Sequence, residues 1–469
     1  MELQLDPEQR AVLWRQVEQL VETYMLSVDS LPVSPRLDAE EIRARLAQFQ
    51  FESPVDPEQA IAFAARNLTE FQVHTPHARY FGLFNPNPTA MGVFADALAA
   101  GFNPQMAAWS HSPFACEVEA HVIRTLGQRF GYDLESTDGV FCSGGAEANH
   151  TALLAALTNE FPYFGDRGVR GLAAQPVFYV SAEAHHSFHK AARLCGIGLE
   201  ALRAVPVDGQ SRMRTDTLAE MIAADRWAGL APFLIVATAG TTNAGVCDPI
   251  PTISAVARSE RVWLHVDAAW GGAAALAPSV RHILNGIDSA DSFTFDAHKW
   301  LSVPMGAGVY LTRHRSILSR TFATPTAYMP KEAAAFDVVD PHQHSMQWSR
   351  RFIGLKVFLS LAVAGWSGYE EVIEHMVRMG ALLKDELRAS RWRVVNETPL
   401  PIACFVDEGG ADPQIIVNGV LASGQAWCST TMLGGHGMVL RACITNYATQ
   451  EEDVRGLVAA LNAARGTLK

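Results

Sequence analysis

Two apolar runs that end in charged residues place the strongest constraint on what this chain can fold into. Residues 262–266 read as a strand that is buried on both faces, and Asp267 follows it directly. A second strand-like run later in the chain leads into Lys299, which stands between a histidine and a tryptophan. A carboxylate at the end of a buried strand is costly unless it has a cationic or hydrogen-bonding partner. The two runs therefore predict a sheet with a polar site at its strand ends.

The lysine has the chemistry of a covalent anchor for a carbonyl compound. A lysine in apolar surroundings loses its proton more readily, because desolvation disfavours the charged form. The uncharged amine can attack an aldehyde and hold it as a Schiff base. An acid that keeps a pyridine nitrogen protonated completes the requirements of pyridoxal 5'-phosphate (PLP), so Lys299 and Asp267 together suggest this cofactor. On spacing alone, a structural ion pair between two strand ends stays open.

The flanking residues strengthen the cofactor interpretation. The segments 265–270, 290–292 and 298–300 read HVDAAW, ADS and HKW. They closely resemble the group II pyridoxal-phosphate-dependent amino acid decarboxylases, the family of the aromatic-L-amino-acid and glutamate decarboxylases. The resemblance spans roughly residues 75 to 360. It implies the α/β architecture of PLP fold type I (aspartate-aminotransferase-like), a Schiff base at Lys299, and Asp267 at the pyridine nitrogen.

Composition describes a soluble globular protein and argues against other classes. At 469 residues we expect two or three domains. The net charge of −12 and the lack of a lysine/arginine run argue against a nucleic-acid partner. No apolar stretch is long enough for a membrane span, and the N-terminus does not read as a secretory signal. Seven cysteines without CxxC spacing fit reduced thiols in a cytoplasm, and no histidine pair has metal-ligand partners at suitable spacing.

Three regions are expected along the chain. Residues 1–75 read as helices that begin at Asp6, Asp38 and Asp56 and have no evident core of their own. In the family such a segment packs on the partner subunit, so a homodimer is implied. Strands and helices alternate from about 140 to 315, which predicts a doubly wound, mostly parallel sheet within a large PLP-binding domain, residues 76–355. Residues 356–469 read as a small C-terminal α/β domain.

A glycine turn between a strand and a helix, residues 140–149, is the candidate phosphate site. Backbone amides at a helix N-terminus attract phosphate, and glycine lets the anion approach closely. A Gly-Gly pair is more often an ordinary turn, but this one stands at the family's phosphate-binding position. The resemblance therefore assigns Gly145 and Ala146 to the phosphate, with Ser143 as a further contact.

Four more residues match cofactor contacts of the family. His185 follows a buried strand and stands where the family places a histidine on the pyridine ring, with His186 as the adjacent alternative. Thr238 ends another strand, Ala269 follows Asp267 closely, and His298 is expected to contact the phosphate.

Residues 321–345 show no clear period, as is typical of lids. In the family a tyrosine of this loop returns a proton after carbon dioxide leaves, and Tyr328 matches it. The implied catalytic residues are thus Lys299, Asp267, His185 and Tyr328. Arg351 matches an arginine that supports the substrate site, although a charge at a helix start would look the same.

Two segments match the family's substrate pocket, the second of them contributed across the dimer. The first supplies Phe84 and Asn85, and the second supplies Trp109 and His111; an interdomain loop is the alternative for the first. Aromatic side chains in these segments favour an aromatic L-amino acid. Polar residues such as Ser110, and the replacement of a family tyrosine and phenylalanine by Leu83 and Ala107, leave an acidic or other polar substrate open.

Rival functions share part of this apparatus. An aldehyde synthase of the same family typically has phenylalanine at the loop position, so Tyr328 favours simple decarboxylation to the amine. A transaminase would carry an arginine near the C-terminus, and Arg441 could be taken for it, but the His-Lys-Trp context favours a decarboxylase. A catalytically silent regulatory homologue is disfavoured because all four catalytic residues are present.

Overall fold

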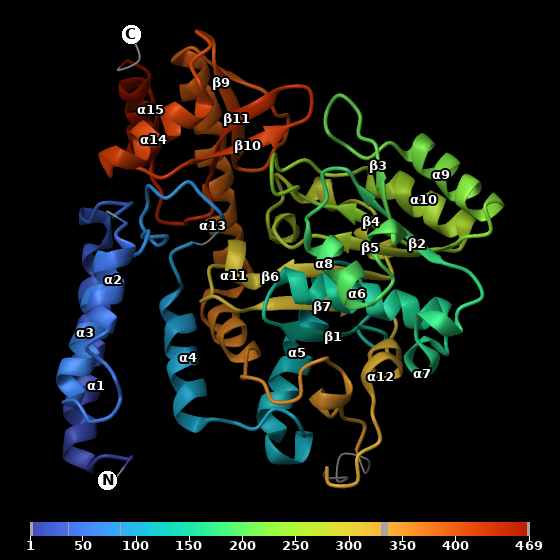
Figure 1. Ribbon diagram of the computed structural model, residues 1–469, viewed down its shortest axis with the longest axis horizontal. Helices are drawn as coiled ribbons and strands as arrows, with labels where there is room; N and C mark the ends of the chain where they lie inside the picture. The colour runs from blue at the N-terminus through green and yellow to red at the C-terminus, as the bar shows by residue number, and fades with distance from the viewer. Residues whose placement is uncertain (1–2, 36, 85, 330–335, 467–469) are drawn as a thin grey trace.

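The computed structural model describes residues 3–35, 37–84, 86–329 and 336–466, and Figure 1 shows three parts. A column of N-terminal helices stands beside a large α/β domain, and a smaller C-terminal α/β domain touches both. None of the helices in the described ranges combines the length and the apolar character needed to cross a membrane.

The N-terminal column consists of α1 (Pro7–Ser27), α2 (Ala39–Leu46) and α3 (Pro57–Glu70). Each helix begins where the sequence predicted, because Asp6, Asp38 and Asp56 accept backbone N–H groups of the first turn. No described residue of these three helices is buried. Apolar side chains are left in solvent, including Trp14 at 59% exposure and Leu26 at 85%.

The large domain is built on a seven-stranded sheet with the order β1-β7-β6-β5-β4-β2-β3. In that order the strands are β1 (Asp138–Cys142), β7 (Gly308–Thr312), β6 (Ser292–Asp296), β5 (Trp263–Asp267), β4 (Ala231–Thr238), β2 (Pro176–Ser181) and β3 (Leu202–Val205). The five strands from β6 to β3 run parallel, whereas β7 is antiparallel to both of its neighbours. The expected mostly parallel sheet is confirmed.

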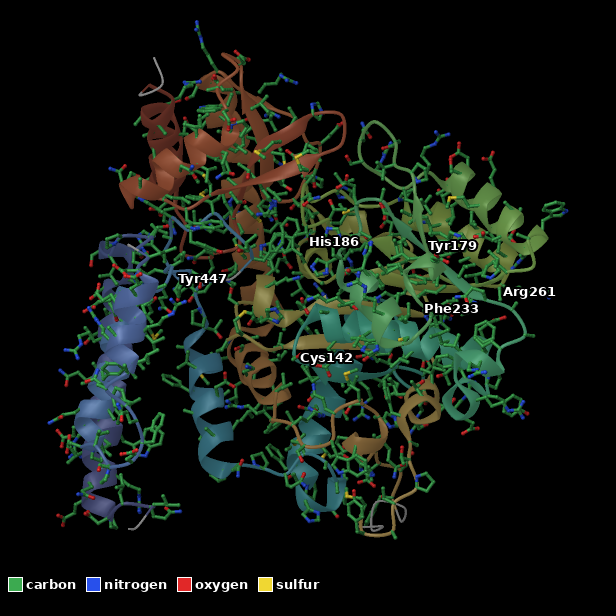
Figure 2. All side chains as sticks on the ribbon, viewed as in Figure 1. Cys142, Tyr179, His186, Phe233, Arg261 and Tyr447 are labelled. Carbon is green, nitrogen blue, oxygen red and sulfur yellow. The ribbon has the colours of Figure 1, made fainter. Side chains whose placement is uncertain are left out.

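Helices cover both faces of this sheet because its strand residues alternate between two cores. Phe178 and Val180 of β2 pack into a cluster with α6 (Gly145–Glu160) and α8 (Ser187–Leu194). Val177 and Tyr179 belong to the cluster on the opposite face. That face is covered by α5 (Pro113–Arg129), α9 (Thr215–Trp227) and α10 (Ile250–Glu260). Figure 2 labels Cys142 of β1 and Tyr179 of β2, which mark different parts of the same sheet.

The remaining helices of the large domain are short or lie at its rim. They are α4 (Ala90–Phe102), α7 (Phe164–Arg167), α11 (Ala297–Trp300) and α12 (Ile317–Phe322). The four-residue α11 follows β6 directly and carries Lys299, so the end of a fully buried strand fixes the backbone of the lysine.

The C-terminal domain begins with the long α13 (Gly354–Ala389), which breaks at Gly365 where φ is 65°. A four-stranded antiparallel sheet follows with the order β10-β11-β9-β8. Its elements are β8 (Trp392–Val394), β9 (Ile402–Asp407), β10 (Ser429–Leu433) and β11 (Gly437–Cys443), together with α14 (Pro413–Ser423) and α15 (Glu451–Gly466). The predicted α/β pattern is present, and β10 is a strand that the sequence did not reveal.

Candidate active site

The carboxyl ends of the parallel strands bring the predicted cofactor residues together. Thr238 at the end of β4 pairs in register with Asp267 at the end of β5, and Asp267 pairs with Thr294 of β6. Lys299 follows β6 after one short turn. This edge of a doubly wound sheet is where ligands bind in such folds.

Asp267 is held rigidly by neighbours in a buried polar chain. It is 5% exposed, and its Oδ2 accepts a 2.8 Å hydrogen bond from Nδ2 of Asn149 in α6. Its Oδ1 accepts the backbone N–H of Ala269 at 3.1 Å. Asn149 was not singled out from the sequence, because a lone asparagine four residues into a helix gives no signal by itself. These bonds fix the carboxylate at one orientation.

Lys299 is the cation of the site. Its Nζ lies 3.0 Å from Oδ2 of Asp296, the last residue of β6, and 5.5 Å from the ring centre of Phe84. Asp296 is buried, and it too escaped notice in the sequence although it stands in the same segment. The lysine side chain is 21% exposed and pairs with Asp296, so the simple ion pair between Asp267 and Lys299 is not what the structure shows.

The glycine turn has the form of an anion site at the start of a long helix. Gly144 is the N-cap of α6 and offers no side-chain acceptor, so the first amides of the helix stay available. A Cβ added at Gly145 would come within 2.8 Å of Asp296 Oδ2 and 3.2 Å of Ala269 Cβ. Ser143 is exposed, and its Oγ donates to Glu147 at 2.7 Å. Gly145, Ala269 and Asp296 therefore lie next to one another at this turn.

Two histidines lie near this turn, and burial lowers the pKa of both. Burial lowers the pKa of His185, an effect that the charge of Asp267 opposes, and Nδ1 of His185 accepts the backbone N–H of Ser187 at 3.2 Å. Figure 2 labels the neighbouring His186. Burial also lowers the pKa of His298, whose Cε1 would lie 3.6 Å from a Cβ at Gly144. Each ring is therefore neutral near pH 7 and close to the residues predicted to bind cofactor.

Phe84 forms an aromatic wall next to the lysine. Its backbone has φ of 67°, and its buried ring packs on Trp270 at 4.6 Å between ring centres. The guanidinium of Arg441 lies 4.9 Å from the same ring. Arg441 is 2% exposed and donates to the carbonyls of Thr242 and Gly82 at 3.0 Å each, while one terminal nitrogen has no partner among the described residues. Asn85, the next predicted residue, lies outside the described residues.

Four predicted residues do not reach Lys299 within this chain. Tyr328 is 76% exposed and stacks on Trp348 at 6.2 Å. Trp109 donates its indole N–H to Glu117 and lines a cavity of about 700 Å³ that none of the predicted cofactor residues borders. His111 is exposed. Arg351 is also exposed and reaches a backbone carbonyl of α4, so its substrate role stays a prediction.

The residues present fit PLP. The free amides of α6 suit a phosphate, and the buried carboxylate of Asp267 suits a protonated pyridine nitrogen. The hydroxyl of Thr238 is buried and finds no hydrogen-bond partner in the described part of the chain, as expected of a group that bonds to a ligand. Within the described residues no cluster of histidine, cysteine or acidic side chains has the form of a metal site.

Comparison with known proteins agrees with this geometry. The model of the pyridoxal-dependent decarboxylase conserved domain matches residues 41–407. This chain belongs to the pyridoxal-dependent decarboxylase family. Membership confirms PLP as the cofactor and amino acid decarboxylation as the chemistry, which the sequence motifs had implied.

Relatives with different substrates are similar to this decarboxylase. An aromatic-L-amino-acid decarboxylase from Bacillus atrophaeus is 31% identical over 98% of this chain and 96% of its own length. An L-aspartate decarboxylase from Metarhizium robertsii is 30% identical over 77% of this chain and 73% of its own. Among solved structures, Oryza sativa TDC with PLP and tryptamine superposes with a TM-score of 0.93 at 24% identity, covering 100% of both chains. The last likeness shows the shared fold.

Proposed function

We propose that this decarboxylase converts an aromatic L-amino acid to its amine and carbon dioxide. The proposal rests on one observation above all: Lys299 and Asp267 lie at neighbouring strand ends beside an uncapped, glycine-lined helix start. The aromatic preference is supported by the Phe84–Trp270 wall beside Lys299 and by the similarity to the aromatic-L-amino-acid decarboxylase.

Each residue is assigned one task. PLP, when bound, supplies an electron sink for the pair released from the carboxylate bond of the substrate. Lys299 binds the cofactor aldehyde covalently and later releases the product amine. Asp267 holds the proton on the pyridine nitrogen, and His185 packs on the ring. The residues that would hold and orient the cofactor are Gly145, Ala146, Ser143, Thr238, Ala269 and His298.

Tyr328 is proposed to return the proton to the α-carbon of the substrate. Its exposed position means that the loop must close over an active site before this step. Trp109, His111, Phe84, Asn85 and Arg351 are proposed to shape the substrate pocket. We further propose a cytoplasmic homodimer, in which residues 1–75, 76–355 and 356–469 are the N-terminal segment, the cofactor domain and the small domain.

A second candidate, decarboxylation of an acidic amino acid, is favoured by Arg441. Its guanidinium is buried beside Phe84, and one of its nitrogens has no hydrogen-bond partner among the described residues. A substrate carboxylate would satisfy that nitrogen. Relatives named as acidic amino acid and L-aspartate decarboxylases show that such activities occur in the family.

Incubation of the PLP-loaded protein with pooled L-amino acids, followed by mass spectrometry, distinguishes the two candidates. Aromatic amines are expected as products, and β-alanine or γ-aminobutyrate would instead establish the acidic candidate. Lys299→Ala should lose turnover and borohydride trapping of the cofactor, because the amine that binds the aldehyde is removed. Turnover by Lys299→Ala would refute the assignment.

Replacement of Tyr328 tests the proton-return step. Tyr328→Phe should leave PLP affinity unchanged but divert the product from amine towards aldehyde and ammonia, because the proton donor is gone. The ratio of amine to aldehyde is the measurement. Tyr163→Phe, at an exposed tyrosine on the N-terminal side of α7, serves as the control. An unchanged ratio in Tyr328→Phe would remove Tyr328 from this role.

A further inference from the structure

A turn that follows β4 joins the two α/β domains through hydrogen bonds. Residues 239–247 leave the sheet after Thr238 and return to it, because Ala239 and Cys247 form an antiparallel bridge. The N–H of Thr238 donates to Oδ2 of Asp248 at 2.8 Å, and the carbonyl of Thr238 accepts the N–H of Asp248 at 2.9 Å. The turn thus begins and ends beside a residue that is proposed to hold the cofactor.

Side chains of the C-terminal domain hold the backbone of this turn. Each carbonyl group of residues 242–245 accepts a hydrogen bond of 2.7–3.2 Å from a side chain of that domain. The donors, in the order of the carbonyls, are Arg441, Cys404, Asn396 and Thr398. Because these bonds go to backbone atoms, they do not depend on the side chains of the turn itself. The turn should therefore stay folded when one of its side chains is shortened.

One side chain of the turn extends the contact between the domains. Nδ2 of Asn243 donates to Oε2 of Glu183 at 3.1 Å, and Oδ1 of Asn243 accepts the hydroxyl of Thr431 at 2.9 Å. Thr431 belongs to β10 of the C-terminal domain, and Glu183 stands two residues before His185 in the turn after β2. A line of three side chains therefore runs from the C-terminal domain to the turn that carries His185.

The turn that carries His185 depends on hydrogen bonds for its shape. At its start, the N–H of Glu183 donates to Oγ of Ser181, the last residue of β2, at 3.2 Å. At its end, the N–H of Ser187 donates to Nδ1 of His185 at 3.2 Å. Residues 182–184 between them are exposed or half-buried, so close packing does not fix their place. The bond from Asn243 to Glu183 holds this middle part of the turn.

We propose that Asn243 is a positioning residue of this decarboxylase. It links the turn of His185 to β10, so that the C-terminal domain determines how the His185 ring lies on the cofactor. A misplacement of about 1 Å that originates far from the reacting atoms can lower a rate by about a hundredfold. The inference rests on the proposed function, because it takes the contact between His185 and the cofactor from there.

Three substitutions break the line at different points and leave the backbone contacts of the turn in place: Asn243→Ala, Thr431→Val and Glu183→Ala. Two conservative substitutions keep its hydrogen bonds, because Thr431→Ser retains the hydroxyl and Glu183→Gln retains an oxygen acceptor. Thr430→Val is the matched control. Thr430 precedes Thr431 in β10, and its hydroxyl donates to Gln414 of α14 at 3.1 Å instead of to the turn.

Hydrogen exchange of the free, full-length protein, read by mass spectrometry of its peptides, reports on the His185 turn without cofactor chemistry. Each of the three breaking variants should raise the exchange rate of residues 182–187 about fivefold, because the turn opens more readily after losing a hydrogen bond. Peptides that cover residues 239–247 should exchange as in the unmodified protein. Unchanged exchange of residues 182–187 in Thr431→Val would overturn the proposal, since the C-terminal domain would then not act on this turn.

The rate of carbon dioxide release from pooled L-amino acids by the PLP-loaded protein tests the consequence for the reaction. The rate should fall about tenfold in the three breaking variants and stay unchanged in Thr431→Ser, Glu183→Gln and Thr430→Val. Asn243→Ala combined with Thr431→Val should cost no more than either alone, because both break the same line. Losses that multiply in the double variant, or faster exchange with an unchanged rate, would overturn the proposal.

The variant His185→Ala separates a failure of this inference from a failure of the proposed function. It should lose more activity than Asn243→Ala, because it removes the ring that Asn243 only helps to place. An unchanged rate in His185→Ala would refute the role proposed for His185, whatever the exchange rates show. A slower rate in His185→Ala together with an unchanged rate in Thr431→Val would refute only the role of Asn243.

Discussion

At the scale of residues, the buried polar chain behind Asp267 explains how a carboxylate can survive in the core. Oδ1 of Asn149 accepts the hydroxyl of Thr294 at 2.7 Å and lies 3.3 Å from Nε2 of His265. Nδ1 of His265 in turn lies 2.9 Å from the hydroxyl of Ser292. The side chains of this hydrogen-bonded network thus satisfy one another, as buried polar networks require. The orientation of Asp267 therefore depends on residues that never touch a ligand.

Stability at acidic pH should depend on His265. Burial lowers the pKa of this histidine from 6.5 to about 4. Below pH 6.5 the unfolded chain therefore binds a proton here that the folded protein does not, so stability falls as the pH drops from 6.5 to about 4. The full loss attributable to this residue is about 3 kcal/mol. His265→Gln should flatten the pH dependence of the free energy of unfolding by about that amount.

Urea unfolding between pH 7 and pH 4.5 measures the free energy of unfolding of His265→Gln and of the unmodified protein. The two proteins are compared by how steeply this free energy changes with pH, not by its absolute value. The comparison is needed because Asp248 acts in the opposite direction: burial raises its pKa to about 6, so the folded protein gains a proton there first as the pH falls. His121→Gln, at an exposed histidine of α5, is the control. Parallel slopes for His265→Gln and the unmodified protein would contradict the prediction.

Single residues were predictable from the sequence only where a motif surrounds them. Lys299, Asp267 and the Gly144–Gly145 turn stand in segments that resemble a family, and the structure places Asp267 and Lys299 at neighbouring strand ends, with Asp296 between Lys299 and the turn. Asn149 and Asp296 were missed because their importance depends on contacts between strand ends, which no local pattern encodes. From the sequence, Arg441 stood out only as a residue that could be taken for the arginine of a transaminase. Its contact with Phe84 became visible only in three dimensions.

At the scale of elements, an internal ion pair fastens the segment before α13 to α5. Arg350 and Glu119 are both buried, and Arg350 donates two hydrogen bonds to the carboxylate, one of them 3.0 Å long. Glu119 also accepts the backbone N–H of Gly354, the first residue of α13. The ion pair therefore ties the residues just before α13 to α5.

Loss of one partner of this pair should cost more than loss of both. Arg350→Met should lower the free energy of unfolding by about 3–5 kcal/mol, because it leaves the carboxylate of Glu119 buried and unpaired. Combining it with Glu119→Gln should recover a large part of that loss. Urea unfolding of both single variants and of the double variant measures the coupling. Additive effects would show that the two side chains do not depend on each other.

Element types followed well from hydrophobic patterns, and sheet topology did not. The strand expected at 262–266 is β5, and the strands expected before His185 and up to Thr238 are β2 and β4. Fully buried apolar runs specify such strands strongly. The antiparallel direction of β7 and the existence of β10, which has mostly half-buried residues, depend on pairing partners far away in the chain.

At the scale of the whole molecule, the chain by itself leaves too much apolar surface in solvent. None of the described residues within the helices α1, α2 and α3 is buried, and Figure 1 shows these helices beside the rest of the molecule rather than covered by it. Apolar side chains on α4 are exposed as well, with Phe102 at 82% and Phe94 at 51%. Helices that leave this many large apolar side chains exposed are typical of an interface. It supports the proposed homodimer, in which Trp109 would complete the site of the partner subunit.

Mixing two inactive variants tests this exchange between subunits directly. Lys299→Ala removes the anchor, and Trp109→Ala should impair the pocket. If Trp109 serves the partner, a mixed dimer has one site with both defects and one intact site. Unfolding and refolding an equimolar mixture should then restore about a quarter of the unmodified activity, because half of the dimers are mixed and each has one working site of two. Refolding each variant alone is the control. If Trp109 acts within its own subunit, the mixture stays as inactive as the variants, and light scattering then decides whether the chain is a dimer at all.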